Sequence, residues 1–120
     1  MTVAAVRPAV ADDRPAAERF LAPHQLPHGP RTLLLEALGI VVAGSAIGDP
    51  PATVALVADD ADGGLLGVGA LQRLYGPWAE AAVVVDDDAD AEQALLDALN
   101  AAARQQGVTT VTATIRRNPQ

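Results

Sequence analysis

The segment 79–115 constrains the fold most, because it predicts a strand, an acidic turn, a helix and a second strand in succession. "AEAAVVV" at 79–85 is the small, β-branched apolar run of a buried strand. Residues 89–106 then carry an apolar stripe at helical spacing: Leu95, Leu96, Leu99 and Ala103. Gly107 suits the C-terminal cap of that helix, and "VTTVTATI" at 108–115 alternates as a strand does. We therefore expect a helix packed against a sheet.

Two further strands are predicted just before this segment. "TVALVAD" at 53–59 and "LLGVGALQRL" at 65–74 flank the turn sequence "DADGG", which is typical of a β-hairpin. "YGP" at 75–77 is a second turn that leads into the strand 79–85. The middle of the chain is therefore expected to be a meander of three antiparallel strands.

The N-terminal part predicts one strand and two helices. Residues 2–7 are a short apolar strand, and a helix comes next in which Pro15 suits an early position and Pro23 marks the end. Three prolines and a glycine predict a loop at 23–30. A short helix is expected at 32–38, ahead of a glycine.

The predicted order is strand, helix, helix, three antiparallel strands, helix, strand. The stretch 40–43 fits either an extension of the second helix or a strand. This order is typical of an α+β fold with a mixed sheet and helices on both faces. The alternative is a ferredoxin-like domain of βαββαβ order, which leaves the strand 79–85 surplus.

The composition fits one soluble domain. The chain has 120 residues, half of them apolar, so 1–120 is expected to form a single domain with one core. Cysteine is absent, which excludes disulfides and thiolate chemistry. The net charge of −7 argues against nucleic acids and anionic membranes as partners. The longest apolar stretch, 33–47, is too short to span a bilayer, and the start does not look like a signal peptide, so a cytoplasmic protein is expected.

Three pieces of the chain resemble, in the correct order, the GNAT acetyltransferase superfamily. "VRPAVADDRPAAERFL" at 6–21 resembles the opening strand and helix, and "VALVADDADGGLLGVGAL" at 54–71 resembles a hairpin of the family. The segment 79–108 resembles the strand and helix that hold acetyl-CoA. The resemblance covers 3–115, with 23–52 the poorest match, and implies a GNAT-like mixed sheet.

Two departures from the family pattern bear on activity. Family members place an Arg/Gln-x-x-Gly-x-Gly/Ala signature between the coenzyme strand and helix, where backbone N–H groups hold the pyrophosphate. Here 86–93 is "DDDADAEQ", which has neither glycine nor arginine and repels a polyanion. The family also continues beyond the last strand with a helix and a hairpin that carry its usual general-acid tyrosine. The resemblance therefore implies a truncated, degenerate member of the family.

Two functions are implied by this resemblance. The first is a non-catalytic interaction or regulatory module, a pseudoenzyme without cofactor that partners a larger enzyme or itself. The alternative is an acyl-CoA-dependent N-acetyltransferase with a rebuilt site for acetyl-CoA. In that case the resemblance implies Glu80 as general base and the backbone of Val83, Val84 and Val85 as the binding site of the pantetheine arm.

No metal site is predicted. The acids at 86–92 are explained by their place at a helix start, where Asp90 and Gln93 have capping-box spacing. A divalent-cation site made by several of these carboxylates is the alternative. His24 and His28 have the four-residue spacing of a helical metal pair, but the prolines around them predict a surface loop.

The last strand is expected to be an interface. A β-branched, alternating strand with an uncovered edge invites pairing with another chain, and 108–115 is followed only by "RRNPQ". We expect a homodimer, or a protein partner added by strand pairing, through Val111, Thr112, Ala113 and Ile115.

Overall fold

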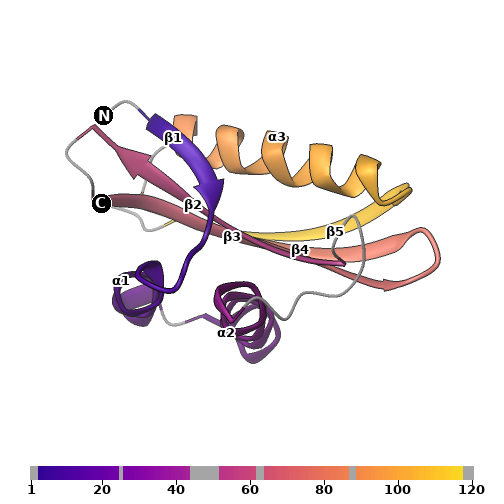
Figure 1. The fold of residues 1–120 in the computed structure, drawn as a ribbon, viewed down its shortest axis with the longest axis horizontal. Coiled ribbons are helices and arrows are strands. Elements are labelled where there is room, and N and C mark those ends of the chain that lie inside the picture. The colour runs from indigo at the N-terminus through magenta and orange to yellow at the C-terminus, as the bar shows by residue number, and fades with distance from the viewer. Residues whose placement is uncertain (1–2, 25, 44–51, 62–63, 87–88, 118–120) are drawn as a thin grey trace.

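The computed structural model describes residues 3–24, 26–43, 52–61, 64–86 and 89–117. Its elements (Figure 1) are, in chain order, β1 (Val3–Pro8), α1 (Asp13–Leu21), a 3₁₀ turn η1 (Ala22–His24), α2 (His28–Val42), β2 (Thr53–Asp60), β3 (Leu65–Tyr75), β4 (Trp78–Val85), α3 (Ala89–Gln105) and β5 (Thr110–Arg117). None of the helices in this part of the chain is long and apolar enough to cross a membrane.

The five strands form one sheet whose spatial order, β1-β2-β3-β4-β5, is the same as their order in the chain. β1, β2 and β3 are each antiparallel to the next strand, whereas β5 is parallel to β4. Parallel neighbours need a crossover, and α3 supplies it between these two strands. The mixed α+β sheet is thus as predicted. The ferredoxin-like alternative is wrong, because it has no place for β4, which pairs with both β3 and β5.

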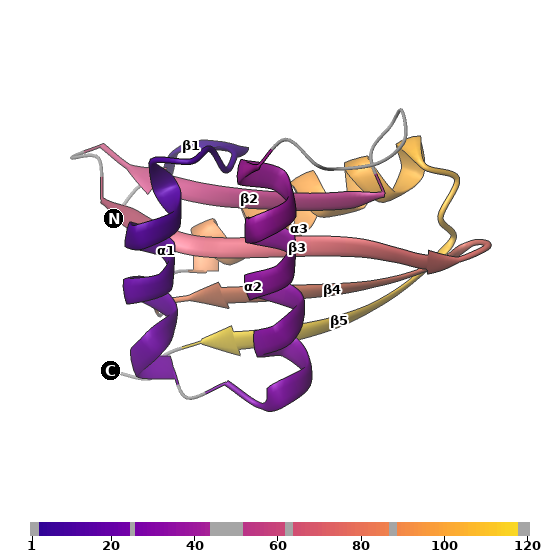
Figure 2. The ribbon, with the colours of Figure 1, turned by 60° about the horizontal axis from the view of Figure 1, so that its bottom comes forward.

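Helices cover both faces of the sheet, as predicted. α1 and α2 lie side by side on one face, and α3 runs along the other (Figures 1 and 2). The core layer under α1 and α2 includes Leu34, Leu38, Val57, Val68 and Val84. The layer under α3 includes Leu66, Leu71, Val83, Leu95 and Leu99. Successive strand residues point to opposite faces, so neighbours in one strand serve different layers.

Two glycines of β3 let α3 lie close to the sheet. A Cβ atom at Gly67 would be 2.8 Å from Leu95 Cδ1 and 2.8 Å from Val85 Cγ1. A Cβ atom at Gly69 would be 3.3 Å from Leu99 Cδ1. Because these positions lack a side chain, the two leucines of α3 pack onto the strand backbone, and both are buried.

An ion-pair cluster joins β1, β2 and the start of α1. Arg7 donates from Nη1 and Nη2 to the two carboxylate oxygens of Asp13, at 2.7 and 2.8 Å, and from Nε to Asp59 at 2.7 Å. Asp13 also accepts the backbone N–H of Val10 at 2.8 Å. The hydrogen bonds from Arg7, and then that from Val10, hold the pKa of the Asp13 carboxyl below its usual range, although burial acts in the opposite direction. The cluster fixes the turn from β1 into α1.

The helix expected at 32–38 is present, but α2 starts four residues earlier and ends four residues later. The predicted loop at 23–30 is therefore wrong at its C-terminal end, which is helical, and η1 occupies its start. Pro27 is the N-cap, with φ −56° and ψ 155°, and Pro30 lies in the first turn. Backbone N–H groups have no helical acceptor there, so neither proline disturbs the helix. The undecided stretch 40–43 continues the helix through its first three residues.

The C-terminal helix and strand differ only slightly from expectation. α3 matches the predicted helix 89–106 to within one residue, and Gly107 comes after it with φ +76°, as a glycine cap does. The N–H of Val108 donates to the Ala103 carbonyl at 2.9 Å, so Val108 belongs to the cap and not to the strand. β5 consequently begins and ends two residues later than the predicted strand 108–115.

Candidate functional site

Strand β4 is paired on both edges along the stretch that the family resemblance assigns to the coenzyme arm. Val83 pairs with Gly69 of β3 and with Ile115 of β5. The next two residues are paired in the same way: Val84 with Val68 and Arg116, and Val85 with Gly67 and Arg117. All three valine side chains are buried. A pantetheine arm that bonds to this backbone would therefore have to displace β5.

The turn from β4 into α3 is acidic at the place of the family's phosphate signature. Asp86 is exposed, and 87–88 lie outside the described residues. In the first turn of α3, Asp90 is exposed and Glu92 accepts Nη2 of Arg117 at 2.9 Å. Acids at this position stabilise the helix through its dipole, and they repel a bound polyphosphate.

Two of the smaller expectations need correction. The capping box is wrong, because α3 already includes Asp90 and the Gln93 amide donates to Asp97 at 2.9 Å. The surface loop proposed for the histidines is also wrong, since His24 ends η1 and His28 begins α2. They still do not share a helix. Within the described ranges, no three His, Asp or Glu side chains gather closely enough to hold a metal ion.

Glu80 stands at a shallow cavity on the face covered by α1 and α2. It is exposed and pairs in register with Thr112 of β5. The cavity, of about 120 Å³, is lined by Gly29, Pro30, Leu33, Glu80, Ala81, Thr112 and Thr114. A carboxylate beside two hydroxyl groups can bind an amine or a hydroxyl group of a small ligand. The sequence points to Glu80, but the two threonines join it only because β5 runs parallel to β4.

Strand β5 is an edge of the sheet, and in the described part of the chain it pairs with β4 alone. Of the expected interface residues, Thr112, Ala113 and Ile115 are exposed and Val111 is half-buried. Ile115 has 44% of its surface exposed, because α3 packs mainly over β2, β3 and β4. The outer edge of β5 and one of its faces are therefore open to solvent.

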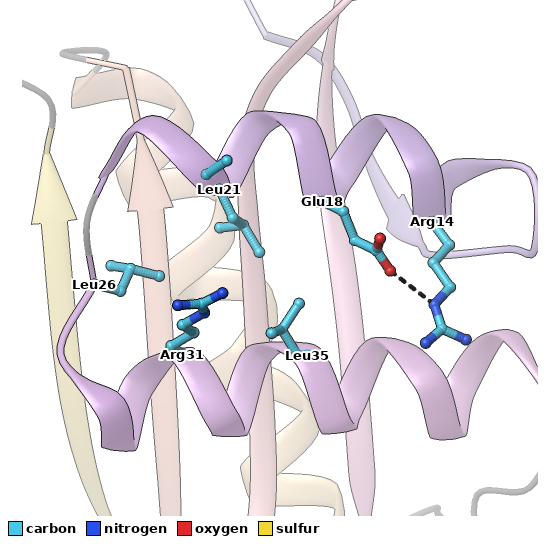
Figure 3. Close-up of a pocket in the computed structure, with 7 residues that line it drawn as sticks. Arg14, Glu18, Leu21, Leu26, Arg31 and Leu35 are labelled. Carbon is cyan, nitrogen blue, oxygen red and sulfur yellow. Dashed lines mark hydrogen bonds and ion pairs between the residues drawn. The ribbon is translucent and has the colours of Figure 1, made fainter.

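A second cavity, which the sequence did not predict, lies between α1 and α2 (Figure 3). It has a volume of about 360 Å³ and is lined by Arg14, Glu18, Leu21, Ala22, Leu26, Arg31 and Leu35. We call it the helix groove. The only signal available was helical spacing, since Arg31 and Leu35 are four residues apart on one side of α2. The predicted helix start at residue 32 left Arg31 outside the helix and so hid that signal.

Comparisons with known proteins give structural matches only. No protein-family model and no curated protein matches the sequence. An acetyltransferase of the GNAT family from Staphylococcus aureus Mu50 is 13% identical, with a TM-score of 0.70 over 91% of this chain and 71% of that one. A GCN5-related N-acetyltransferase from Kribbella flavida is 21% identical, with a TM-score of 0.58 over 89% of this chain and 68% of that one.

These matches cover about nine-tenths of the chain. At such low identity the likeness concerns the path of the backbone and not the chemistry of side chains. The order of strands and helices that the sequence predicts is thus found in solved acetyltransferases, and the chain has the GNAT acetyltransferase fold.

Proposed function

We propose that this chain is a non-catalytic GNAT-fold module that acts by binding another protein, either a larger enzyme or a second copy of itself. The observation that carries the proposal is the pairing of β4 on both edges at Val83, Val84 and Val85. Backbone groups that are already bonded within the sheet are not free to bond to a coenzyme arm. To free them, the ladder between β4 and β5 would have to break.

The charge of the neighbouring turn supports the same proposal. The start of α3 offers a pyrophosphate the partial positive charge of a helix dipole, roughly half an elementary charge. Opposed to it are the exposed carboxylates of Asp86 and Asp90, and Arg117 is already bound to Glu92. The balance at this helix start is negative, so binding of a polyphosphate is unfavourable there.

Calorimetric titration with acetyl-CoA and with CoA tests whether the chain binds a coenzyme. We expect no saturable heat at physiological ligand concentrations. The variant Asp86→Asn/Asp90→Asn separates the two causes, because it removes charge and leaves the strand pairing in place. It should also fail to bind. A low-micromolar dissociation constant for the parent chain would overturn the proposal, and binding by the variant alone would show that charge and not strand pairing excludes the coenzyme.

The edge of β5 supports a protein partner as the ligand of this module. Its stretch of threonines and apolar residues carries no charge between Thr110 and Ile115, and charges are a common protection of edge strands. In an antiparallel pair of two copies with Ala113 opposite itself, Ile115 would lie across from Val111 of the other copy. The exposed apolar side chains of β5 would then contact their counterparts across the dimer axis as cross-strand pairs.

Light scattering at micromolar concentration tests the homodimer. We expect twice the monomer mass, and Ile115→Glu should reduce it to the monomer. Val10→Glu is the matched control, since Val10 is an exposed apolar residue far from β5, with 53% of its surface accessible. A monomeric parent chain would refute self-association, and a dimer that survives Ile115→Glu would place the interface elsewhere.

A second candidate function is an N-acyltransferase with a rebuilt coenzyme site, favoured by the cavity at Glu80. There a carboxylate could accept the proton of an acceptor amine while Thr112 and Thr114 orient it. The test is acyl transfer from acetyl-CoA to small amines, with Glu80→Gln as the variant. Turnover by the parent chain that Glu80→Gln abolishes would favour this function over the non-catalytic module.

A further inference from the structure

The helix groove combines an apolar floor with a guanidinium group that has no partner among the described residues. Leu21 is buried, and Leu26 and Leu35 are half-buried, so the floor is aliphatic. Figure 3 shows Arg31 extending from α2 into the space between the helices, with its guanidinium group among these leucines. No described residue forms a hydrogen bond or an ion pair with that side chain.

The charges that line the groove do not cancel. Glu18 is its only acidic residue in the described part of the chain, and it accepts Nε of Arg14 at 3.0 Å, which leaves Arg31 uncompensated. The groove is thus locally positive, although the formal net charge of the whole chain is −7. An arginine fork pairs best with a planar anion that accepts two parallel hydrogen bonds. A carboxylate meets that requirement.

The groove continues along α2 beyond Leu35. A more open cavity shares Arg14 and Leu35 with it and is lined further by Glu36, Gly39 and Ile40. The stretch of helix from Arg31 to Gly39 spans about 12 Å. A Cβ atom at Gly39 would be 3.9 Å from the Arg14 guanidinium, so the glycine leaves room there. Glu36 is exposed, more than one helical turn away from Arg31. The combined space is therefore elongated along α2, with Arg31 at one end and the more open cavity beside Gly39 at the other.

We propose that the helix groove binds a linear aliphatic carboxylate of medium chain length. Arg31 pairs with the carboxylate, Leu21, Leu26 and Leu35 contact the first part of the hydrocarbon chain, and the far end lies beside Gly39. This site is separate from the turn before α3 and from the edge of β5. The proposal for this site is independent of the proposed function, because the residues argued for coenzyme exclusion and for dimer formation lie outside the groove.

Titration of the full chain with octanoate, followed by amide NMR shifts, tests the site. We expect saturable shifts centred on Leu26, Arg31 and Leu35. Loss of the charge-assisted pair in Arg31→Gln should weaken binding about tenfold. Arg104→Gln is the matched control, because Arg104 is an exposed arginine on α3 and should bind like the parent. Octanol has the same hydrocarbon chain without the carboxylate. Its affinity for the parent chain should be no higher than the affinity of octanoate for Arg31→Gln.

Ligands of different chain length, together with a second variant, probe the far end of the groove. Gly39→Val fills that end, so it should weaken octanoate and leave butyrate unchanged. Thermal unfolding of each variant checks that it remains folded. Three results would overturn the proposal: no saturation with octanoate, equal affinity in the parent and Arg31→Gln, or inorganic phosphate binding as tightly as octanoate. The last would mean that the apolar floor takes no part in binding.

Discussion

The close packing of α3 on the sheet at Gly67 gives a quantitative prediction for Gly67→Ala. The new methyl group would be 2.8 Å from both Leu95 Cδ1 and Val85 Cγ1, and 3.1 Å from the Val84 carbonyl oxygen. Leu95 and Val85 are fully buried, so neither side chain has free space to move into. Overpacking of this kind costs about 1–3 kcal/mol. Replacing a strand glycine by alanine also stabilises the fold by roughly 0.5–1 kcal/mol, because it lowers the conformational entropy of the unfolded chain. We expect a net loss of about 1–2 kcal/mol.

Gly69→Ala is the matched control, because it makes the same chemical change two residues away on the same face of β3. Its methyl group would be 3.3 Å from Leu99 Cδ1, so that side chain need shift only slightly, and 3.7 Å from the nearest backbone atom, the Ala82 carbonyl oxygen. The cost of overpacking and the stabilisation from replacing a glycine should then cancel, so the free energy of unfolding should change by less than about 0.5 kcal/mol. Urea unfolding followed by circular dichroism measures both free energies, with an unchanged m-value as the check on two-state behaviour. Equal stabilities for the two variants would refute the packing argument.

Two other predictions concern the core and the ion-pair cluster. Leu99→Asp should prevent folding, because an unpaired buried carboxylate costs several kcal/mol, comparable to the stability of a small domain. Leu96→Asp should stay folded, since Leu96 is only half-buried and its carboxylate can reach water, and circular dichroism separates the two outcomes. Because Arg7 lowers the pKa of Asp13, the stabilisation by this carboxyl is complete above the usual aspartate pKa of about 3.9 and is lost as the pH falls through the lowered value. Asp13→Asn should therefore be less stable than the parent at pH 6 and approach it in strong acid, and parallel stability curves over that range would contradict the assignment.

The sequence predicts best the elements whose signals are local. The meander is indicated by apolar runs separated by turns, and the glycine cap marks the end of α3 because its signal lies within a few residues. The start of α2 is not predicted, because prolines generally break helices, whereas Pro27 and Pro30 stand at the N-cap and in the first turn, where a proline is harmless. A proline breaks a helix when helical residues precede it and suits a helix start when they follow it, so a count of prolines alone cannot decide.

The candidate sites depend on arrangements that no single segment reveals. Glu80 is visible in the sequence, but its neighbour Thr112 belongs to a strand whose parallel pairing is set by the crossover. The helix groove needs α1 and α2 to lie side by side, which brings Leu21 of one helix and Arg31 of the other to the lining of the same cavity. Such contacts arise from packing on a common sheet face, and sequence periodicity only indicates which side of each helix faces that sheet.

The two edges of β5 link coenzyme exclusion to partner binding. Its inner edge completes the pairing of β4, and its outer edge is open in the described part of the chain. A coenzyme arm on the backbone of Val84 would require β5 to move away from β4, and the outer edge would move with it. A partner strand bonded to that outer edge would hold β5 in place, because moving β5 would then break backbone hydrogen bonds on both of its edges. Dimer formation and coenzyme binding should therefore oppose each other. If acetyl-CoA did bind, Ile115→Glu should strengthen its binding, and an affinity that is the same in both chains would show that the two edges act independently.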